Sequence, residues 1–425
     1  MQTPRQNSPG GVGRGPLSAV ELPVLFAAPH RLFFLVGVVQ LVAAMLFWLA
    51  VLAGWYIPAL PSIPLAIFGA PAHGFLMLFG VFTFFVFGFI TTVFPRWLAS
   101  TEVAGARYTT IAALMTLGVL GVYTGFFLGR LVAFAGCAVF VVGWGVGVRT
   151  LLGVWRDSAR PDKRFALFPL GFISAGAAGA AVYSAWLVTP QPALLNTAMA
   201  IGLWLYLVPL VVAISHRMIP FFSGSVLSDY RAVKPGWTLP ATLLCVVVHF
   251  VLTISDLAEW AVFSDLSLAL IAAWHSVQWG LWRSLRIPLL GMLHISFSWL
   301  ALAMLLYTAD GLLRLTGTPA GLGLAPMHAL GIGFVASMVV AMATRVSLGH
   351  SGRTLVAGRI ALWTFALVQI TAVVRVFAEI GPLSTGLLRA WLILAAALLW
   401  LVAFIPWCLH YGALYVRPRV DRQPG

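Results

Sequence analysis

Two of the nine histidines share a local pattern that suits metal binding. Pro71 precedes His73 by two positions and Pro326 precedes His328 by two positions, each at the expected start of an apolar helix. Proline is well placed in the first turn of a helix, where its missing N–H leaves no hydrogen bond unmade. The positive end of the helix dipole disfavours imidazolium there, and metals bind the neutral imidazole. Two such helices at equal depth would offer one ligand to each face of a haem iron.

The residues at helical spacing from these histidines are compatible with a flat macrocycle. From His73 the spacing leads to Met77, Gly80, Phe84 and Gly88, and from His328 to Gly331, Val335, Met338 and Met342. Small residues allow a macrocycle to approach, and the Phe-rich run around Phe84 would supply a dry wall. The alternative is structural, because small residues in membrane helices usually mediate helix–helix packing. A single histidine at a helix end is also often a hydrogen-bonded structural residue.

The remaining histidines and arginines offer weaker patterns. His30, His216, His350 and His410 lie at span ends on the side opposite His73, and His294 starts a span on that side. His249 and His275 lie inside spans without a companion at ligand spacing. Arg345 and Arg353 are candidates for contact with phosphates or haem propionates, or for anchoring the membrane leaflet.

Other kinds of catalytic site find little support. Asp265 is the one carboxylate expected well inside a span, which argues against a pump built on buried acids and against paired-carboxylate hydrolysis. No GxxxxGK[ST] motif is present to cradle a nucleotide. The three cysteines, Cys137, Cys245 and Cys408, stand alone, without the CxxC or CxxCH spacing of a redox or c-type haem motif.

The elements that must position these residues are membrane helices. Of 425 residues, 61% are hydrophobic and only 8% are charged, about a third of the share in a soluble domain. Apolar runs of about 20 residues recur along the chain, each long enough to cross a hydrocarbon core of roughly 30 Å. The composition therefore predicts an all-α, polytopic membrane protein and excludes a disordered chain or a disulfide scaffold.

The pattern of apolar runs predicts twelve spans in one membrane domain, residues 29–412. A flexible polar tail (1–28) precedes this domain, without the apolar region of a signal peptide, and a basic tail (413–425) follows it. The spans are expected at about 32–52, 72–94, 108–128, 131–149, 166–189, 195–215, 237–254, 258–281, 289–310, 326–346, 355–377 and 388–411.

Charge sets the expected orientation of these spans. The net charge of +14 comes from short loops spread between the spans, not from one patch, so nucleic-acid binding is not indicated. Nearly all basic residues fall in the two tails and in the loops after even-numbered spans; the exceptions are Arg130, Arg314, Arg375 and Arg389. The positive-inside rule therefore predicts that both termini are cytoplasmic.

At the tenth span the sequence resembles the NnrS family. Residues 328–334 and 342–353 carry the similarity, and the run Thr344–Arg353 is its most specific part. Five shorter stretches are also similar to the family and follow in the expected order: residues 31–35, 77–80, 94–97, 218–222 and 293–299. The resemblance thus covers most of the chain.

The resemblance implies a bacterial inner-membrane protein of twelve spans. Family members are associated with haem and copper, with denitrification and with the response to nitric oxide. By position, His73, His294, His328 and His350 match family histidines, so they are the expected metal ligands. The expected cofactors are haem b and copper, with Met77 and Arg345 as further cofactor-binding residues. Nitric oxide and the lipid bilayer are the expected partners.

The chain departs from the family in the second span. The family pattern His-x-His-Glu-Met reads His73-Gly-Phe-Leu-Met77 here, so the second histidine and the glutamate are missing. This predicts one metal centre or none.

Two other functions stay open. One is a haem–copper-oxidase-like oxidoreductase, although its paired-histidine and His-Pro-Glu copper motifs are missing, and the other is a transporter without a cofactor. Whether nitric oxide would be consumed or sensed also stays open.

Overall fold

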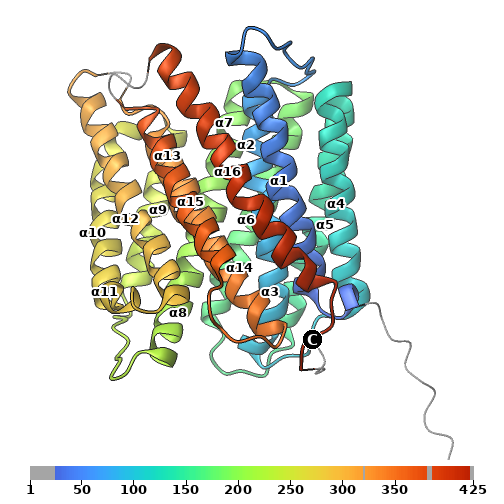
Figure 1. The fold of residues 1–425 in the computed structure, drawn as a ribbon, viewed down its shortest axis with the longest axis vertical. Coiled ribbons are helices and arrows are strands. Elements are labelled where there is room, and N and C mark those ends of the chain that lie inside the picture. Colours follow the sequence, from blue (N-terminus) through green and yellow to red (C-terminus); the bar gives the residue numbers. More distant parts are fainter. Residues whose placement is uncertain (1–23, 319–320, 381–384, 422–425) are drawn as a thin grey trace, which may run out of the picture.

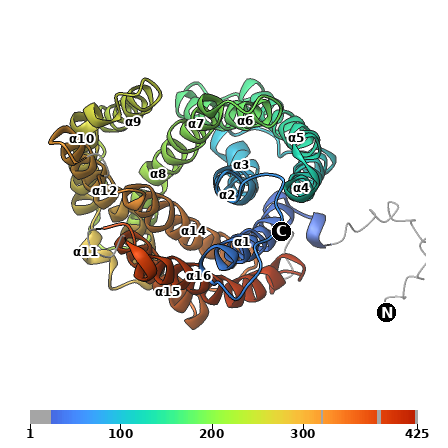
Figure 2. The same cartoon turned by 90° about the horizontal axis from the view of Figure 1, so that it is seen from above.

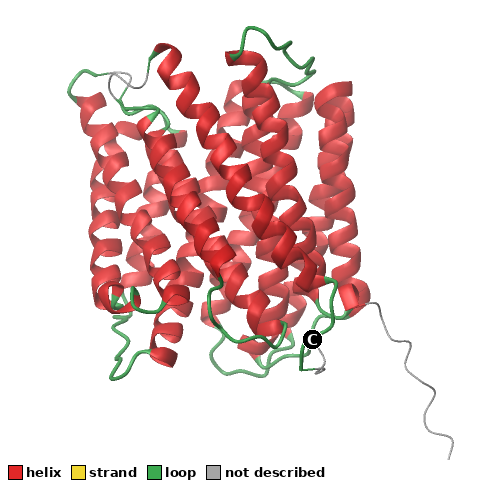
Figure 3. Ribbon diagram, in the orientation of Figure 1, coloured by secondary structure: helices red, strands yellow, loops and turns green. Residues whose placement is uncertain are grey.

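The apolar runs of the sequence form long helices that lie side by side in one bundle (Figure 1). The structure, a computed structural model, describes residues 24–318, 321–380 and 385–421, and every regular element in these ranges is helical (Figure 3). The all-helical fold class is therefore confirmed. Both described ends of the chain lie at one end of the bundle, where Arg31 Nη1 donates a hydrogen bond of 2.8 Å to the Arg417 carbonyl. We call this the basic end, and the opposite end the far end.

Helical segments of the described chain follow one another from end to end of the bundle. They are α1 (Pro29–Tyr56), α2 (Gly69–Phe75) with η2 (Leu76–Val81) and α3 (Phe82–Leu98), α4 (Gly105–Leu128), α5 (Arg130–Arg156), α6 (Leu167–Val188), α7 (Pro192–Ala200) with η4 (Ile201–Leu207) and α8 (Val208–Val226), α9 (Thr238–Ile254), α10 (Val262–Gln278), α12 (Pro288–Leu315), α13 (Ala325–His328) with η6 (Ala329–Ala336) and α14 (Ser337–His350), α15 (Arg359–Phe377) and α16 (Gly386–Tyr415). Short elements join them: η1 (Val24–Phe26), η3 (Arg164–Ala166), η5 (Ala258–Ala261) and α11 (Leu281–Ser284).

Eleven helices within the described ranges are long and apolar enough to cross a membrane. Helix α9 is shorter, with 17 residues, and reaches about 25 Å against a hydrocarbon core of roughly 30 Å. The multi-pass membrane architecture is thus confirmed, whereas the count of twelve depends on α9 and stays a prediction. Several helices are longer than the spans predicted for them. Helix α16 continues to Tyr415, whereas the C-terminal tail was expected to begin at residue 413. Most of the expected N-terminal tail lies outside the described residues.

The bundle is a ring (Figure 2), and it is built from three units, each of four helical stretches that run from end to end, because α2 and α3, α7 and α8, and α13 and α14 each form one stretch. The units are α1–α5, α6–α10 and α12–α16, and the last helix of each packs against the first helix of the next: α5 on α6, α10 on α12, and α16 on α1. The second helix of each unit, α3, α8 or α14, lies inside the ring. The spans that contain these three helices have between 67% and 78% of their apolar stretch buried. They form the core that any interior site must use.

Each of the three inner spans contains a π-helical segment: η2, η4 and η6. The π-helix is rare, and where it occurs it often marks a functional site. Segments η2 and η6 begin within three residues of His73 and directly after His328, respectively. Because a π turn contains more residues than an α turn, the regular spacing used above to predict the faces below these histidines does not hold through them.

We predict that close packing of α4 on α5 depends on glycine at position 118. A Cβ atom there would lie 2.4 Å from the Phe140 backbone nitrogen, so Gly118→Ala should lower the free energy of unfolding by about 1–3 kcal/mol. The control is Gly145→Ala on α5, where no atom lies within 4 Å of the new Cβ. Thermal unfolding in detergent measures both, and equal midpoints for the two variants would contradict the packing account.

Candidate functional site

His73 lies near the start of α2 at the far end of the bundle. Its ring stacks on the Trp48 indole of α1, with centroids 4.2 Å apart and planes inclined by 11°. Its Nδ1 atom is buried and has no hydrogen-bond partner among the described residues. Stacking therefore orients this imidazole, while the ring nitrogen inside the bundle is left without the partner that buried polar atoms normally have.

His328 closes α13 at the same end of the bundle. Its Nδ1 lies 2.9 Å from the Leu324 carbonyl oxygen. A carbonyl can only accept, so Nδ1 carries the hydrogen and Nε2 carries the lone pair. Metal-binding histidines typically have this arrangement, in which a hydrogen bond from one ring nitrogen fixes the tautomer and orients the other toward the metal. The hydrogen bond to the Leu324 carbonyl thus leaves Nε2 as the ring nitrogen whose lone pair is available.

The two histidines come from different units of the ring but share one electrostatic environment. His73 and His328 are close enough for their charges to interact, and Arg375 of α15 acts on both. Helix α2 packs on α1 and α7, whereas α13 packs on α12 and α15. The structure therefore places both histidines at the far end, on helices with separate supports.

A cluster of charges beside the pair was not singled out from the sequence. Arg375 and Arg389 both form ion pairs with the buried carboxylate of Glu379, and Arg389 Nη2 lies 3.1 Å from Glu379 Oε2. These arginines were noticed only as exceptions to the charge rule. Their departure from the charge rule was the usable signal, because a buried arginine at membrane depth is costly and usually marks a functional position.

The other predicted ligands lie elsewhere. His294 Nε2 is 2.9 Å from Ser223 Oγ, in a contact between α12 and α8. His350 ends α14 at the basic end, and its ring centroid lies 4.3 Å from that of His30. Within the described ranges no three His, Cys, Asp or Glu side chains gather as a metal site. The four histidines expected as ligands thus divide into the His73–His328 pair and two separate positions.

Met77 and Arg345 are also separated. Met77 lies half-buried within η2, one turn beyond His73. Arg345 lies near the basic end of α14, with its guanidinium 3.9 Å from the ring centroid of Phe222. Arg345 follows His328 by seventeen positions, which correspond to about 25 Å of helix. Arg345 is therefore remote from the histidine pair.

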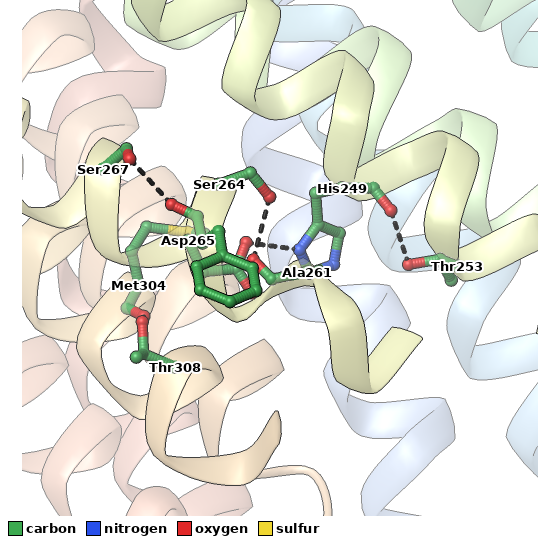
Figure 4. Close-up of polar contacts among 9 residues, drawn as sticks. His249, Thr253, Ala261, Ser264, Asp265, Ser267, Met304 and Thr308 are labelled. Atoms are coloured by element: carbon green, nitrogen blue, oxygen red, sulfur yellow. Dashed lines mark hydrogen bonds and ion pairs between the residues drawn. The ribbon is translucent and has the colours of Figure 1, made fainter. Parts of the chain in front are cut away.

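The structure contains a buried acid–base pair that sequence reasoning missed. His249 of α9 and Asp265 of α10 are almost fully buried, and Nδ1 lies 2.6 Å from Oδ1 (Figure 4). The Trp204 ring of η4 lies 3.7 Å from the His249 ring, centroid to centroid. In the sequence neither residue has a partner at ligand spacing, but His249 and Asp265 lie on either side of the short connection between α9 and α10. Residues on either side of such a helical hairpin meet across it, and that was the usable signal.

The fold and its buried polar pairs define a polytopic helical membrane protein. A family model for the NnrS protein matches residues 24–419, nearly the whole chain. The chain therefore belongs to the NnrS family, which confirms the resemblance found in the sequence. A search of curated proteins gives no match.

We predict strong coupling between His249 and Asp265. Asp265→Asn or His249→Gln alone should lower the free energy of unfolding by about 1–3 kcal/mol, because each leaves a buried partner poorly hydrogen-bonded. The double variant should lose less than the sum, by about 0.5–3 kcal/mol. A thermodynamic cycle from unfolding in detergent measures this, and additive losses would rule out a direct interaction.

Proposed function

We propose that this protein binds haem b between His73 and His328 and acts on nitric oxide in the cytoplasmic membrane of a bacterium. The observation that supports the haem site is the Nδ1 hydrogen bond of His328, which leaves the Nε2 lone pair available to a metal. The association of NnrS proteins with haem and with the nitric oxide response supports the choice of cofactor and substrate.

The residues at the far end fit a haem by three observations. The buried Nδ1 of His73 lacks a partner, and the imidazole of His328 is oriented as a ligand. Gly331 lies three residues after His328, and a Cβ atom there would meet no atom within 4 Å, so open space exists beside this part of the span. Arg375 and Arg389 carry two positive charges against the single negative charge of Glu379. The negatively charged carboxylates of a haem would balance this excess of positive charge.

The two histidines differ in how firmly they are held, and this assigns their roles. His328 is tethered through its hydrogen bond to the Leu324 carbonyl, whereas His73 is oriented by stacking on Trp48. The haem, when bound, supplies an iron that can take nitric oxide as a ligand. With haem bound, His328 would stay in place, and His73, held by the Trp48 stack, would be the residue that moves to make room for nitric oxide.

The surroundings of His73 favour a small neutral gas over water. Phe75 and Phe79, two and six residues after His73, are fully buried, and Phe75 packs against Tyr183 with ring centroids 4.7 Å apart. An apolar wall of this kind excludes water and ions, while nitric oxide dissolves in the apolar phase. Copper is not part of the proposal, because the described residues do not gather three His, Cys, Asp or Glu side chains around one point.

The direct test is an optical spectrum of the purified protein, oxidised and reduced, with a pyridine haemochrome assay. We expect b-type haem, and we expect His328→Ala to lose most of it because the tethered ligand is gone. His410→Ala, which removes an exposed histidine at the other end of the bundle, is the matched control. Equal haem retention in the two variants would refute the ligand assignment.

A second measurement separates the roles of the two ligands. Since His73 is the ligand expected to leave, His73→Ala should retain more haem than His328→Ala and should bind nitric oxide faster. Stopped-flow mixing of the reduced protein with nitric oxide measures the rate. A rate unchanged by His73→Ala would contradict a departing His73.

The proposed orientation in the membrane has its own test. Because the basic loops and both described chain ends lie at the same end of the bundle, the positive-inside rule places that end in the cytoplasm. A reporter fused to the C-terminus should therefore read as cytoplasmic, and one inserted between α1 and α2 as periplasmic. The same reading from both positions would contradict the proposed topology.

A further inference from the structure

A chain of side-chain hydrogen bonds joins three helices of the third unit, α12, α15 and α14. Trp299 Nε1 donates to Gln369 Oε1 at 2.7 Å, and Gln369 Nε2 donates to Ser337 Oγ at 2.8 Å. Ser337 Oγ donates in turn to the Ile332 carbonyl oxygen at 3.2 Å. Polar side chains inside a membrane bundle are costly unless they are bonded, and they often mark functional positions.

The chemistry of these groups determines the direction of the chain. An indole N–H can only donate, so the amide oxygen of Gln369 faces Trp299 and the amide nitrogen faces Ser337. Because that nitrogen donates, the Ser337 hydroxyl accepts there and gives its own hydrogen to the Ile332 carbonyl. Trp299 also lies against Gly333, where a Cβ atom would come within 2.3 Å of the indole Cδ2. The chain therefore begins beside η6 and ends in its backbone.

The last bond of the chain requires a π turn. Hydroxyls in the regular helices bond three or four residues back, as Ser347 Oγ does to the Ala343 carbonyl. Ser337 Oγ reaches five residues back, to the same Ile332 carbonyl that accepts the Ser337 backbone N–H. In a regular α-helix that carbonyl would pair with the N–H of Ala336 instead. The chain therefore stabilises the π form of η6 relative to the α form.

The π form of η6 affects the direction of His328. This histidine lies directly before η6, and its ring is bonded to the Leu324 carbonyl in the same short segment. Each residue of an α-helix turns the chain by about 100° and advances it by about 1.5 Å. If the extra residue of η6 joined a regular helix, α13 would turn by about that angle relative to α14. The ring of His328 would turn with it.

We propose that Trp299, Gln369 and Ser337 are positioning residues that hold the π form of η6 and thereby direct His328 toward the haem iron. This inference rests on the proposed haem site and adds the residues that set the angle of its more firmly held ligand. The three side chains act through the backbone of η6 and not as ligands. Polar residues that merely join membrane helices would stabilise the bundle without controlling His328, and the test separates these two roles.

A second glutamine provides matched controls in the first unit. Tyr123 Oη of α4 donates to Gln40 Oε1 of α1 at 3.0 Å, so this pair also joins an aromatic donor to a glutamine between two helices. Trp299→Phe and Tyr123→Phe each remove the donor and keep an aromatic ring. Gln369→Leu and Gln40→Leu each remove the glutamine and keep most of its bulk. We expect both sets of variants to lower thermal stability in detergent to a similar extent.

The readouts are the haem content and the optical and electron paramagnetic resonance spectra of the purified full chain. A haem with two histidine ligands is low-spin, and a haem that loses one of them becomes high-spin. We expect Trp299→Phe and Gln369→Leu to lose most of the low-spin signal, whereas Tyr123→Phe and Gln40→Leu keep it. Ser337→Ala removes only a hydroxyl, so it should fold and should act like Gln369→Leu.

Two results would overturn the proposal. Equal spectral changes in Gln369→Leu and Gln40→Leu would show that the chain only joins helices. An unchanged low-spin signal in both Gln369→Leu and Ser337→Ala would show that the chain does not direct His328.

Failure of the haem proposal itself gives a different result, because the wild-type protein would then bind no haem. The hold of the chain on η6 is in that case measured by hydrogen–deuterium exchange of the backbone amides over residues 329–337. Faster exchange in Gln369→Leu than in Gln40→Leu supports that hold, and equal exchange in the two variants contradicts it.

Discussion

In the hydrocarbon interior of a membrane, backbone N–H and C=O groups have no water to bond, so they must be satisfied within the protein. This constraint explains why the described chain is helical throughout its regular elements, and why irregular turns of helix occur where they do. The π-helical segments η2, η4 and η6 all lie in the inner spans of the ring, where other helices surround them. A helix at the rim would expose the same irregularity to lipid.

The same constraint separates the buried polar side chains into distinct groups. His73 and His328 lie at the far end beside Arg375, His249 and Asp265 satisfy each other between α9 and α10, and His30 with Arg31 lies at the basic end. Apolar packing fills the space between these groups. Each therefore has to balance its own charge and hydrogen bonds locally, either within the chain or with a bound molecule.

Much of this arrangement follows from the sequence, and the missing parts have physical causes. Hydropathy predicted the helices, and the Pro-x-His pattern predicted that His73 and His328 lie near helix starts. Both predictions depend only on residues that are close together in the chain. The π segments were not predictable, since an apolar run looks the same whether a turn holds an extra residue or not. The contact between His30 and His350 was also not predictable from the sequence, because it depends on how the ring of helices closes.

The closure of α16 on α1 also bears on how the protein is made. Arg31 enters the membrane interface near the start of synthesis, yet its hydrogen-bond acceptor at Arg417 is separated from it by 386 residues. Contacts between the two ends of a chain cannot form until the last helix has left the ribosome. Until then, Arg31 has to find its hydrogen-bond acceptors in the water and lipid headgroups of the interface. A chain truncated before α16 would lack these carbonyl acceptors, so its first helix would keep an exposed guanidinium and its ring would stay open.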